Sequence, residues 1–347
     1  MKKSTQKRVG SALKAAAAAG VFQVLLIFLL CLLWLIWQAG PPASLAQDNP
    51  APVLTPPPPG LSEGRDRAMM LNLLLPDGTV TSITLEDYLR GVLAAEMPAS
   101  FHPEALKAQA VAARTYCIRK QGAGSQRHPQ ADICTDFACC QAWISWEEAT
   151  ARWGRDAARY GEKISQAVTD TDGLVCLYDG WPIDAVFFAS AAGKTSDAKE
   201  VWGSEIPYLV SVASPEGDEV PGWHSEAVFS PAEFAEKIHA AHPEADLTGP
   251  VSTWLTGLST DESGAVAGIT IGGVNLTGPE VRSILGLRSA HFVPAATDDA
   301  LTFSVTGHGH GVGMSQYGAN ALAAQGKDFR DILSWYYTGI TIDHMPQ

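Results

Sequence analysis

The chain has 347 residues, of which 46% are hydrophobic and 18% are charged. This composition is typical of a folded protein of about two domains, and it excludes a collagen-like or disordered chain. The net charge of −13 also argues against a nucleic-acid partner, because binding to a duplex requires clustered Lys and Arg side chains.

An apolar run near the start of the chain predicts a transmembrane helix over residues 20–38. Only Gln23 is polar within Val21–Trp37, and the run is long enough to cross ~30 Å of hydrocarbon. Five Lys and Arg residues precede it, so the positive-inside rule predicts that residues 1–19 lie in the cytoplasm. We therefore expect a single-pass protein of the cell membrane, with its ectodomain outside the cytoplasm. The alternative is a cleaved signal peptide with a cleavage site at Ala43–Ala46, although the run is longer than a typical signal core.

Residues 39–66 are predicted to form a proline-rich linker, which includes the run Pro56–Pro59. Such segments are extended and semi-rigid, so this one would hold a domain away from the membrane. Residues 67–347 remain to form that domain.

Several elements are predicted in the first part of this domain. A β-hairpin is expected over residues 68–83, around the turn at Pro76–Gly78. A helix follows at Leu85–Ala95 and ends before Pro98, because the residue before a proline disfavours helix. A second, alanine-rich helix is expected at Glu104–Lys120 and would pack closely against its neighbours.

The rest of the domain alternates between helix and strand patterns. The stretch Ser214–Ser230 has the character of an exposed insertion. We find no regular βαβ order, and this favours an α+β fold of mixed helices and short strands. Helices are predicted at 146–165, 231–242, 319–324 and 329–336, and strands at 174–178, 185–189, 266–276 and 301–305.

Three sequence blocks carry most of the chemically informative residues. They comprise Leu85–Pro98 with Glu104–Tyr116, then Gly193–Thr195 with Val201–Gly203 and Pro207–Leu209, and finally Gly307–Ala319 with Tyr336–Gly339. Together these blocks resemble the SpoIID (stage II sporulation protein D) family of lytic transglycosylases, over about residues 68–342. The resemblance implies a single elongated ectodomain of the SpoIID type after the membrane helix.

The resemblance also implies a function. It predicts that the protein cleaves peptidoglycan glycan strands already stripped of stem peptides during engulfment in sporulation, without hydrolysis and with a 1,6-anhydromuramyl product. Membrane-bound sporulation partners, including an amidase that removes stem peptides, are implied as well. One alternative is a non-catalytic protein that binds the cell wall and activates such an amidase, and another is a scaffold of the engulfment machinery.

The resemblance assigns the catalytic acid to the Glu of a Glu-Met-Pro motif, which here is Glu96. Cleavage of a glycosidic bond requires a carboxyl that stays protonated near neutral pH. A position at a helix C-terminus, with apolar neighbours, should raise the pKa of Glu96.

Substrate-binding residues are expected on the helix after Glu96 and in the second and third blocks. Arg114 and Lys194 are the expected positive charges for the lactyl carboxylates of a stripped strand. The alternative for Arg114 is a structural ion pair with Glu86 or Asp87. The remaining candidates are Tyr116, Ser190, Thr195, His308, His310, Ser315, Gln316 and Tyr317.

The third block has five glycines between Gly307 and Gly318, which permit close approach of the backbone to a ligand. His308 and His310 would face the same side of an extended segment, where a metal pair or simple packing are alternatives to substrate binding. The second block departs from the family pattern, because Phe188 stands where a His is usual and Ala191 and Ala192 stand where Ser and Gly are common.

One short segment holds His128, Cys134, Cys139 and Cys140. Some SpoIID-type proteins bind zinc in this loop through a His, Cys, His, Cys set. Here Cys139 takes the place of the second His, which gives a Cys3His set that is common in structural zinc sites. A Cys134–Cys140 disulfide and free thiols are the alternatives.

The other cysteines are expected to have different surroundings. Cys31 falls within the predicted membrane helix. Cys117 and Cys176 are expected to be buried apolar thiols.

Overall fold

The computed structural model describes residues 64–123 and 126–345. All of them belong to one compact unit that runs from Pro59 to Gln347. The predicted cytoplasmic segment, membrane helix and nearly all of the linker lie outside the described residues. None of the helices in the described part combines the length and apolar character that a membrane span requires.

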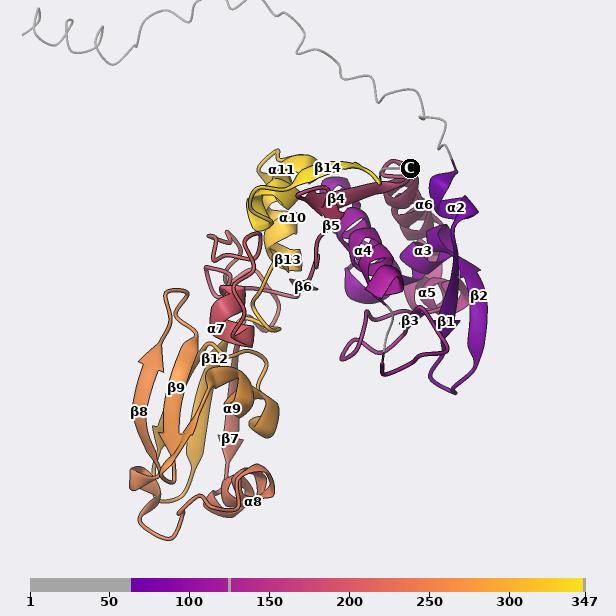
Figure 1. The fold of residues 1–347 in the computed structure, drawn as a ribbon. Helices are drawn as coiled ribbons and strands as arrows, with labels where there is room; N and C mark the ends of the chain where they lie inside the picture. The colour runs from indigo at the N-terminus through magenta and orange to yellow at the C-terminus, as the bar shows by residue number, and fades with distance from the viewer. Residues whose placement is uncertain (1–63, 124–125, 346–347) are drawn as a thin grey trace, which may run out of the picture. The chain divides into compact units, whose positions relative to one another are not determined.

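The described residues form an α+β fold, as predicted (Figure 1). The helices are α2 (Arg65–Ala68), α3 (Leu85–Glu96), α4 (Pro103–Ala123), α5 (Trp146–Trp153), η1 (Gly154–Asp156), α6 (Ala157–Thr169), α7 (Ala198–Trp202), α8 (Pro231–Ala241), η2 (Val251–Thr253), α9 (Gly278–Leu285), α10 (Gln316–Ala324) and α11 (Phe329–Tyr336). The strands are β1 (Met70–Leu74), β2 (Val80–Thr84), β3 (Ile133–Cys134), β4 (Leu174–Tyr178), β5 (Trp181–Pro182), β6 (Phe187–Phe188), β7 (His224–Phe229), β8 (Leu255–Thr260), β9 (Val266–Ile271), β10 (Val274–Leu276), β11 (Phe292–Ala296), β12 (Leu301–Thr306), β13 (Met314–Ser315) and β14 (Thr341–His344).

The first hydrophobic core is built around α4, which α3, α6, α10, α11 and β4 contact (Figure 1). Small side chains allow these elements to approach α4 closely. The alanines at positions 105, 108, 110, 112 and 113 are all fully buried, which confirms the expectation of close packing. Two small sheets flank this core, with strand orders β2-β1-β3 and β14-β4-β5.

A second hydrophobic core lies between α8, α9 and two further sheets, with strand orders β10-β9-β8 and β11-β12-β7. Phe234 of α8 is at its centre. The ring of Phe234 stacks at centroid distances of 6.1 Å on both Trp254 and Phe303. All strand pairs in these two sheets are antiparallel.

Glycines in the left-handed region explain where two predicted elements are divided. The helix expected over 146–165 breaks into α5 and α6 because Gly154 has φ 54°. The strand expected over 266–276 is a hairpin of β9 and β10, which turns at Gly272 (φ 55°) and Gly273 (φ 81°). A side chain disfavours such φ values, so the chain reverses there.

The expectation of an exposed insertion at Ser214–Ser230 is wrong in two respects. Its last part forms β7, which pairs with β12 along its whole length. Its first part buries Ser214 and Glu216, which are 4% exposed. Their polar atoms form hydrogen bonds with one another and with nearby groups. These polar side chains can therefore be buried inside the fold.

Candidate active site

Glu96 opens onto a pocket of about 630 Å³. The pocket lies where several segments distant in sequence converge. They are the end of α3, Tyr116 of α4, the loop 137–142, residues 186–189, Trp202, Arg282 of α9, the loop 308–310 and Gln316 at the start of α10. Among these described residues, Glu96 is the only carboxyl and Arg282 the only Arg or Lys that lines the pocket.

Glu96 is the last residue of α3, as the sequence predicted. One carboxylate oxygen, Oε1, accepts a 2.7 Å hydrogen bond from the backbone N–H of Ala142. Burial raises the pKa of Glu96 above its ordinary value, and hydrogen bonds from Ala142 and the Gln316 side chain oppose that rise. No cation in the described part of the chain contributes to this shift. The carboxyl therefore stays protonated to a higher pH than an exposed glutamate would.

Gly91, five residues before Glu96 in α3, allows the 139–144 loop to lie against α3. A Cβ at this position would be 2.1 Å from Trp143 Nε1 and 2.6 Å from the carbonyl oxygen of Ile144. The Ile144 N–H also donates to the Gly91 carbonyl at 3.4 Å. This contact holds the loop where the Ala142 N–H reaches Glu96.

A buried polar network positions Gln316. The Ser315 hydroxyl caps α10 by accepting the Gly318 N–H at 3.2 Å, and it donates to the carboxylate of Glu216. Glu216 also accepts the Ala191 N–H at 2.7 Å and the Ser214 hydroxyl at 2.5 Å. Sequence analysis missed Glu216, because it falls in the stretch interpreted as exposed.

The glycine-rich third block approaches the protein's own chain rather than open space. A Cβ at Gly309 (φ 121°) would be 2.6 Å from the Cβ of Phe188, and one at Gly313 (φ 78°) would be 2.2 Å from the carbonyl oxygen of Val186. The close approach expected of these glycines is therefore used for packing against residues 186–188.

The two histidines of this block have different surroundings. His310 Nε2 lies 3.0 Å from the Phe187 carbonyl and its Nδ1 accepts the Val312 N–H at 3.2 Å, so both ring nitrogens have partners in the protein. Burial lowers the pKa of His310 to about 4. His308 is exposed at the pocket, where its Nδ1 lies 3.2 Å from Arg288 Nη2.

Arg114 does not line the pocket. Its side chain is fully buried, and its guanidinium donates to Asp66 at 2.6–3.0 Å and to the Leu174 carbonyl at 3.1 Å. The ion pair proposed as the alternative therefore exists, but its partner is Asp66 rather than Glu86 or Asp87. Arg114 joins α4 to α2 and to the start of β4.

The structure brings together only some of the predicted substrate-binding residues. Tyr116, His308, His310 and Gln316 line the pocket with Glu96. Five further candidates lie outside the pocket lining: Ser190, Thr195 and Ser315, which are buried, Lys194, which is exposed, and Tyr317, whose ring packs on Phe101 at a centroid distance of 4.9 Å.

Sequence analysis also missed residues that line the pocket. Phe137 and Trp202 are 80% and 43% exposed, and exposed aromatic rings often mark binding surfaces. Trp202 belongs to the second block, so the sequence motif could have pointed to it as a candidate site residue. Phe137 and Arg282 lie outside all three blocks and gave none.

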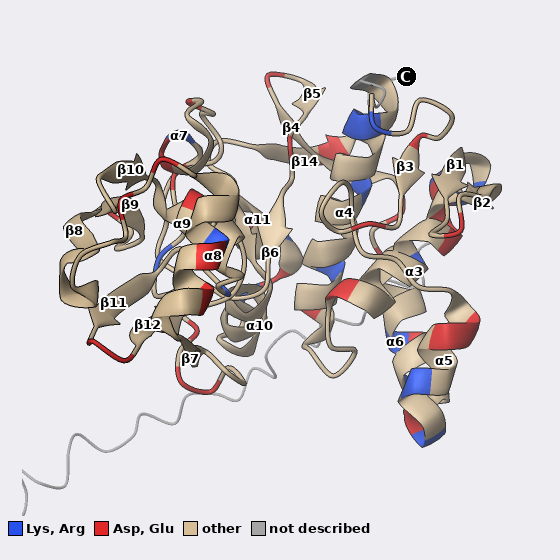
Figure 2. Ribbon diagram, turned by 90° about the horizontal axis from the view of Figure 1, so that it is seen from below, with Lys and Arg blue, Asp and Glu red and all other residues tan. Residues whose placement is uncertain are grey.

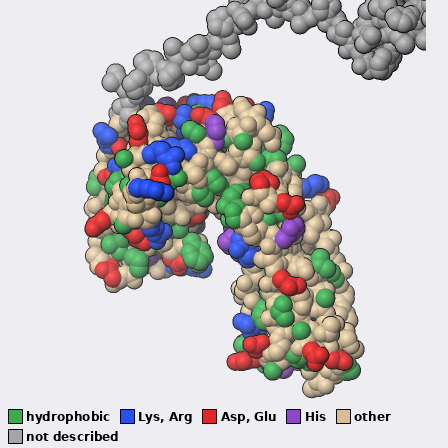
Figure 3. Space-filling view, turned by 180° about the vertical axis from the view of Figure 1, so that it is seen from behind, with side chains coloured by type: hydrophobic (Ala, Val, Ile, Leu, Met, Phe, Trp, Pro, Cys, Tyr) green, Lys and Arg blue, Asp and Glu red, His purple; other side chains and the backbone are tan. Residues whose placement is uncertain are grey.

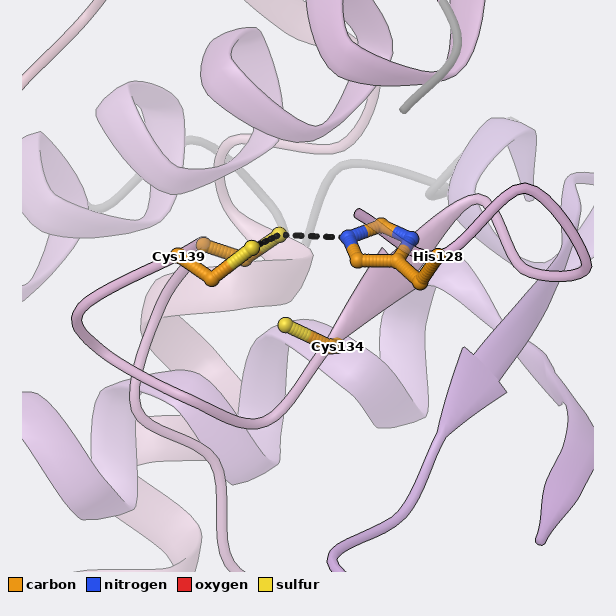
Figure 4. Close-up of side chains that lie close together, drawn as sticks. His128, Cys134 and Cys139 are labelled. Atoms are coloured by element: carbon orange, nitrogen blue, oxygen red, sulfur yellow. Dashed lines mark hydrogen bonds between the residues drawn. The ribbon is translucent and has the colours of Figure 1, made fainter. Parts of the chain in front are cut away.

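The predicted metal ligands lie together beside this pocket. The ligand atoms of His128, Cys134, Cys139 and Cys140 are all within 4.8 Å of one another, and Figure 4 shows the three labelled side chains pointing toward a common point. Cys140 Sγ lies 3.2 Å from His128 Nε2 and 3.9 Å from Cys139 Sγ. None of the five cysteines in the described residues forms a disulfide, and Cys117 and Cys176 are buried as expected.

This cluster matches the dimensions of a tetrahedral zinc site. Zn–S bonds of about 2.3 Å place the sulfurs of such a site about 3.8 Å apart. His128 Nδ1 lies 3.0 Å from the Ala131 carbonyl, so its N–H donates there and leaves the Nε2 lone pair directed at the sulfurs. Such a hydrogen bond is typical of metal-binding histidines. Cys139 and Cys140 also line the pocket, so the cluster and the Glu96 site share one loop.

Comparison with known proteins identifies the family. Residues 77–178 match the family model described as "SpoIID: Stage II sporulation protein". The chain is 40% identical over 265 residues to stage II sporulation protein D of Bacillus amyloliquefaciens, covering 76% of this chain and 75% of that protein. It is 39% identical over 265 residues to the protein of the same name from Bacillus subtilis, with 76% of each covered. It is also 30% identical over 313 residues to a Bacillus subtilis protein named amidase enhancer, covering 73% of this chain and 40% of that protein. The chain belongs to the stage II sporulation protein D (SpoIID) family, which confirms the resemblance found in its sequence.

Proposed function

We propose that this protein is a peptidoglycan lytic transglycosylase that cleaves glycan strands stripped of stem peptides during engulfment. Glu96 would act as the acid and then as the base. The single observation that carries the proposal is one half-buried carboxyl of raised pKa in a pocket that has no second carboxyl among its described lining residues.

The number of carboxyls bears on the reaction type. Most glycosidases that use water have two carboxyls that flank the bond. A non-hydrolytic reaction requires one, because the nucleophile is the C6 hydroxyl of the sugar itself. The pocket therefore fits a lytic transglycosylase better than a hydrolase.

The proposed reaction has two proton transfers at Glu96. The protonated carboxyl donates its proton to the glycosidic oxygen as the bond from that oxygen to C1 breaks. The resulting carboxylate accepts the proton of the C6 hydroxyl, whose oxygen forms the new bond to C1. The products are a free chain end and a 1,6-anhydro sugar, and Glu96 is protonated again.

The test is Glu96→Gln in the full-length protein, with products from stripped glycan strands identified by mass spectrometry. The amide is nearly isosteric and cannot donate an acidic proton, so anhydro products should fall by about 100-fold or more. The variant should unfold at no lower temperature than wild type at pH 7, because burial already disfavours the charged form of Glu96. Cleavage within about tenfold of wild type would show that Glu96 is not the acid.

We propose that His128, Cys134, Cys139 and Cys140 bind one structural zinc ion. The support is the Cys3His donor set, the separations of its ligand atoms and the hydrogen bond that orients His128. Four protein ligands leave no open coordination position, so the metal would stabilise the loop rather than act in the reaction. That loop continues directly to Ala142, whose N–H binds Glu96.

We further propose that the protein is anchored in the cell membrane, with residues 1–19 in the cytoplasm and the catalytic domain outside. The apolar run at residues 20–38 and the basic residues before it support this topology. In this arrangement the pocket would meet the cell wall beside a membrane-bound amidase that removes stem peptides.

The second candidate function is activation of such an amidase without catalysis. The name of one relative, amidase enhancer, favours it. Under this alternative, Glu96→Gln would stimulate a partner amidase as well as wild type does, and neither form would release anhydro products.

A further inference from the structure

Two arginines near the pocket have no carboxylate partner among the described residues. Other arginines of the fold, such as Arg67, Arg114 and Arg119, each form an ion pair with Asp or Glu. Arg282 and Arg288 are half-buried and form none there. Burial lowers the pKa of Arg282, and no carboxylate in the described part of the chain opposes that shift.

Hydrogen bonds to main-chain groups hold these two arginines beside His308. Arg282 Nε donates to the Arg288 carbonyl at 3.2 Å, and the Gly309 N–H donates to the same oxygen at 2.9 Å. The Nη groups of Arg282 are therefore not used by this contact. The buried Nε of Arg288 has no hydrogen-bond partner in the part of the chain that the structure describes.

His308 completes this group of donors. An arginine can only donate, so Arg288 Nη2 must donate to His308 Nδ1, at 3.2 Å. Partial burial and the two arginines lower the pKa of His308. The neutral ring then carries its proton on Nε2, which is a further donor. Figure 3 shows Lys or Arg and His side chains next to each other at the edge of a hollow.

The positive charge lies on the His308 side of the pocket. Arg282 contributes to the lowered pKa values of His308 and His310, but not to the shift of Glu96. A bound anion can therefore be held here while the acid stays protonated.

We propose that Arg282, with His308 oriented by Arg288, binds the free lactyl carboxylate of a muramic acid residue and so selects strands without stem peptides. This rests on the proposed function. In a strand that carries stem peptides this group is a neutral amide, which forms weaker hydrogen bonds with a guanidinium than a carboxylate does. Arg282 would therefore determine the specificity for stripped strands. It would take the carboxylate-binding role that the sequence predicted for Arg114.

The experiment measures binding in the Glu96→Gln background of the full-length protein, so that no strand is cleaved. The two probes are stripped glycan strands and the same strands with their lactyl carboxylates converted to methyl amides. The parent should bind the carboxylate form about tenfold or more tightly, and Arg282→Gln should abolish that preference. Arg282→Lys should keep part of it, because it retains the charge without the planar fork.

Lys237→Gln is the matched control, because it removes one positive charge from the exposed face of α8 in the same part of the fold. It should leave the preference unchanged. If Arg282→Gln weakens binding of both probes equally, Arg282 is structural and the inference is wrong. If the parent has no preference between the probes, the inference also fails, while cleavage by wild type would leave the proposed function standing. If wild type gives no anhydro products, the proposed function itself fails.

Discussion

The two sides of the pocket differ in chemical character and in the way they are held. On one side, Glu96 ends α3 next to the loop of the cysteine cluster, and its hydrogen bonds come from Ala142 and Gln316. On the other, Arg282 and Arg288 flank His308 without a carboxylate partner among the described residues. The first arrangement keeps a proton on a carboxyl, whereas the second offers positive charge.

Because these two sides are separate, one pocket can keep a carboxyl protonated and also present positive charge. A guanidinium close to Glu96 would favour its carboxylate and lower its pKa. A pocket with no positive charge would bind an anionic strand poorly, all the more because the chain has a net charge of −13. Figure 2 shows Lys and Arg dispersed among Asp and Glu over the described elements. Local positive charge must therefore come from individually placed residues.

Removal of a cluster ligand should disrupt the Glu96 side most strongly. We expect Cys134→Ser to lose zinc and to cost on the order of 3 kcal/mol, or roughly 5–10 °C in Tm, because metal binding at such a site contributes to folding. Elemental analysis and calorimetry on protein purified without added metal would measure both effects.

Cys176→Ala is the control for zinc content, because Cys176 is a fully buried thiol outside the cluster. It should keep about one zinc per chain. Zinc far below one equivalent in the wild type, with a Cys134 disulfide in a peptide map, would contradict the metal site.

A smaller change should come from Gly91→Ala. The new Cβ would overlap Trp143 and the carbonyl of Ile144, which should cost about 1–3 kcal/mol and move the Ala142 N–H away from Glu96. Gly122→Ala is matched to it, since this glycine is also in a helix and a Cβ there meets nothing within 4 Å. Thermal unfolding and cleavage rates of the two variants should differ, and equal behaviour would show that the loop does not depend on Gly91.

The smallest effect should be a shift in pH dependence with Gln316→Met. Gln316 lowers the pKa of Glu96 by hydrogen bonding, so its loss should raise that pKa. Because the acid must be protonated, kcat/KM falls as pH rises through this pKa, and the falling limb should move to higher pH. Gln325→Met, at the exposed end of α10, should leave the limb in place. A shift to lower pH in Gln316→Met would contradict the assigned hydrogen bond.

The sequence by itself determined the family, the α+β class, the position of Glu96 at a helix end and the membership of the cysteine cluster. These features depend on local signals, which are motif spacing, the proline after α3 and closely spaced ligands. The alanine pattern of α4 likewise predicted its close packing, because side-chain size limits how closely helices pack.

Only the tertiary structure decided which residues reach the pocket. Arg114 was a plausible cation until Asp66, distant in sequence, proved to be its partner. Arg282 had no signal, because the lack of a carboxylate around it in the described fold depends on which segments surround it. Burial and ion pairing depend on which segments contact one another in the fold, and a local sequence pattern does not specify those contacts.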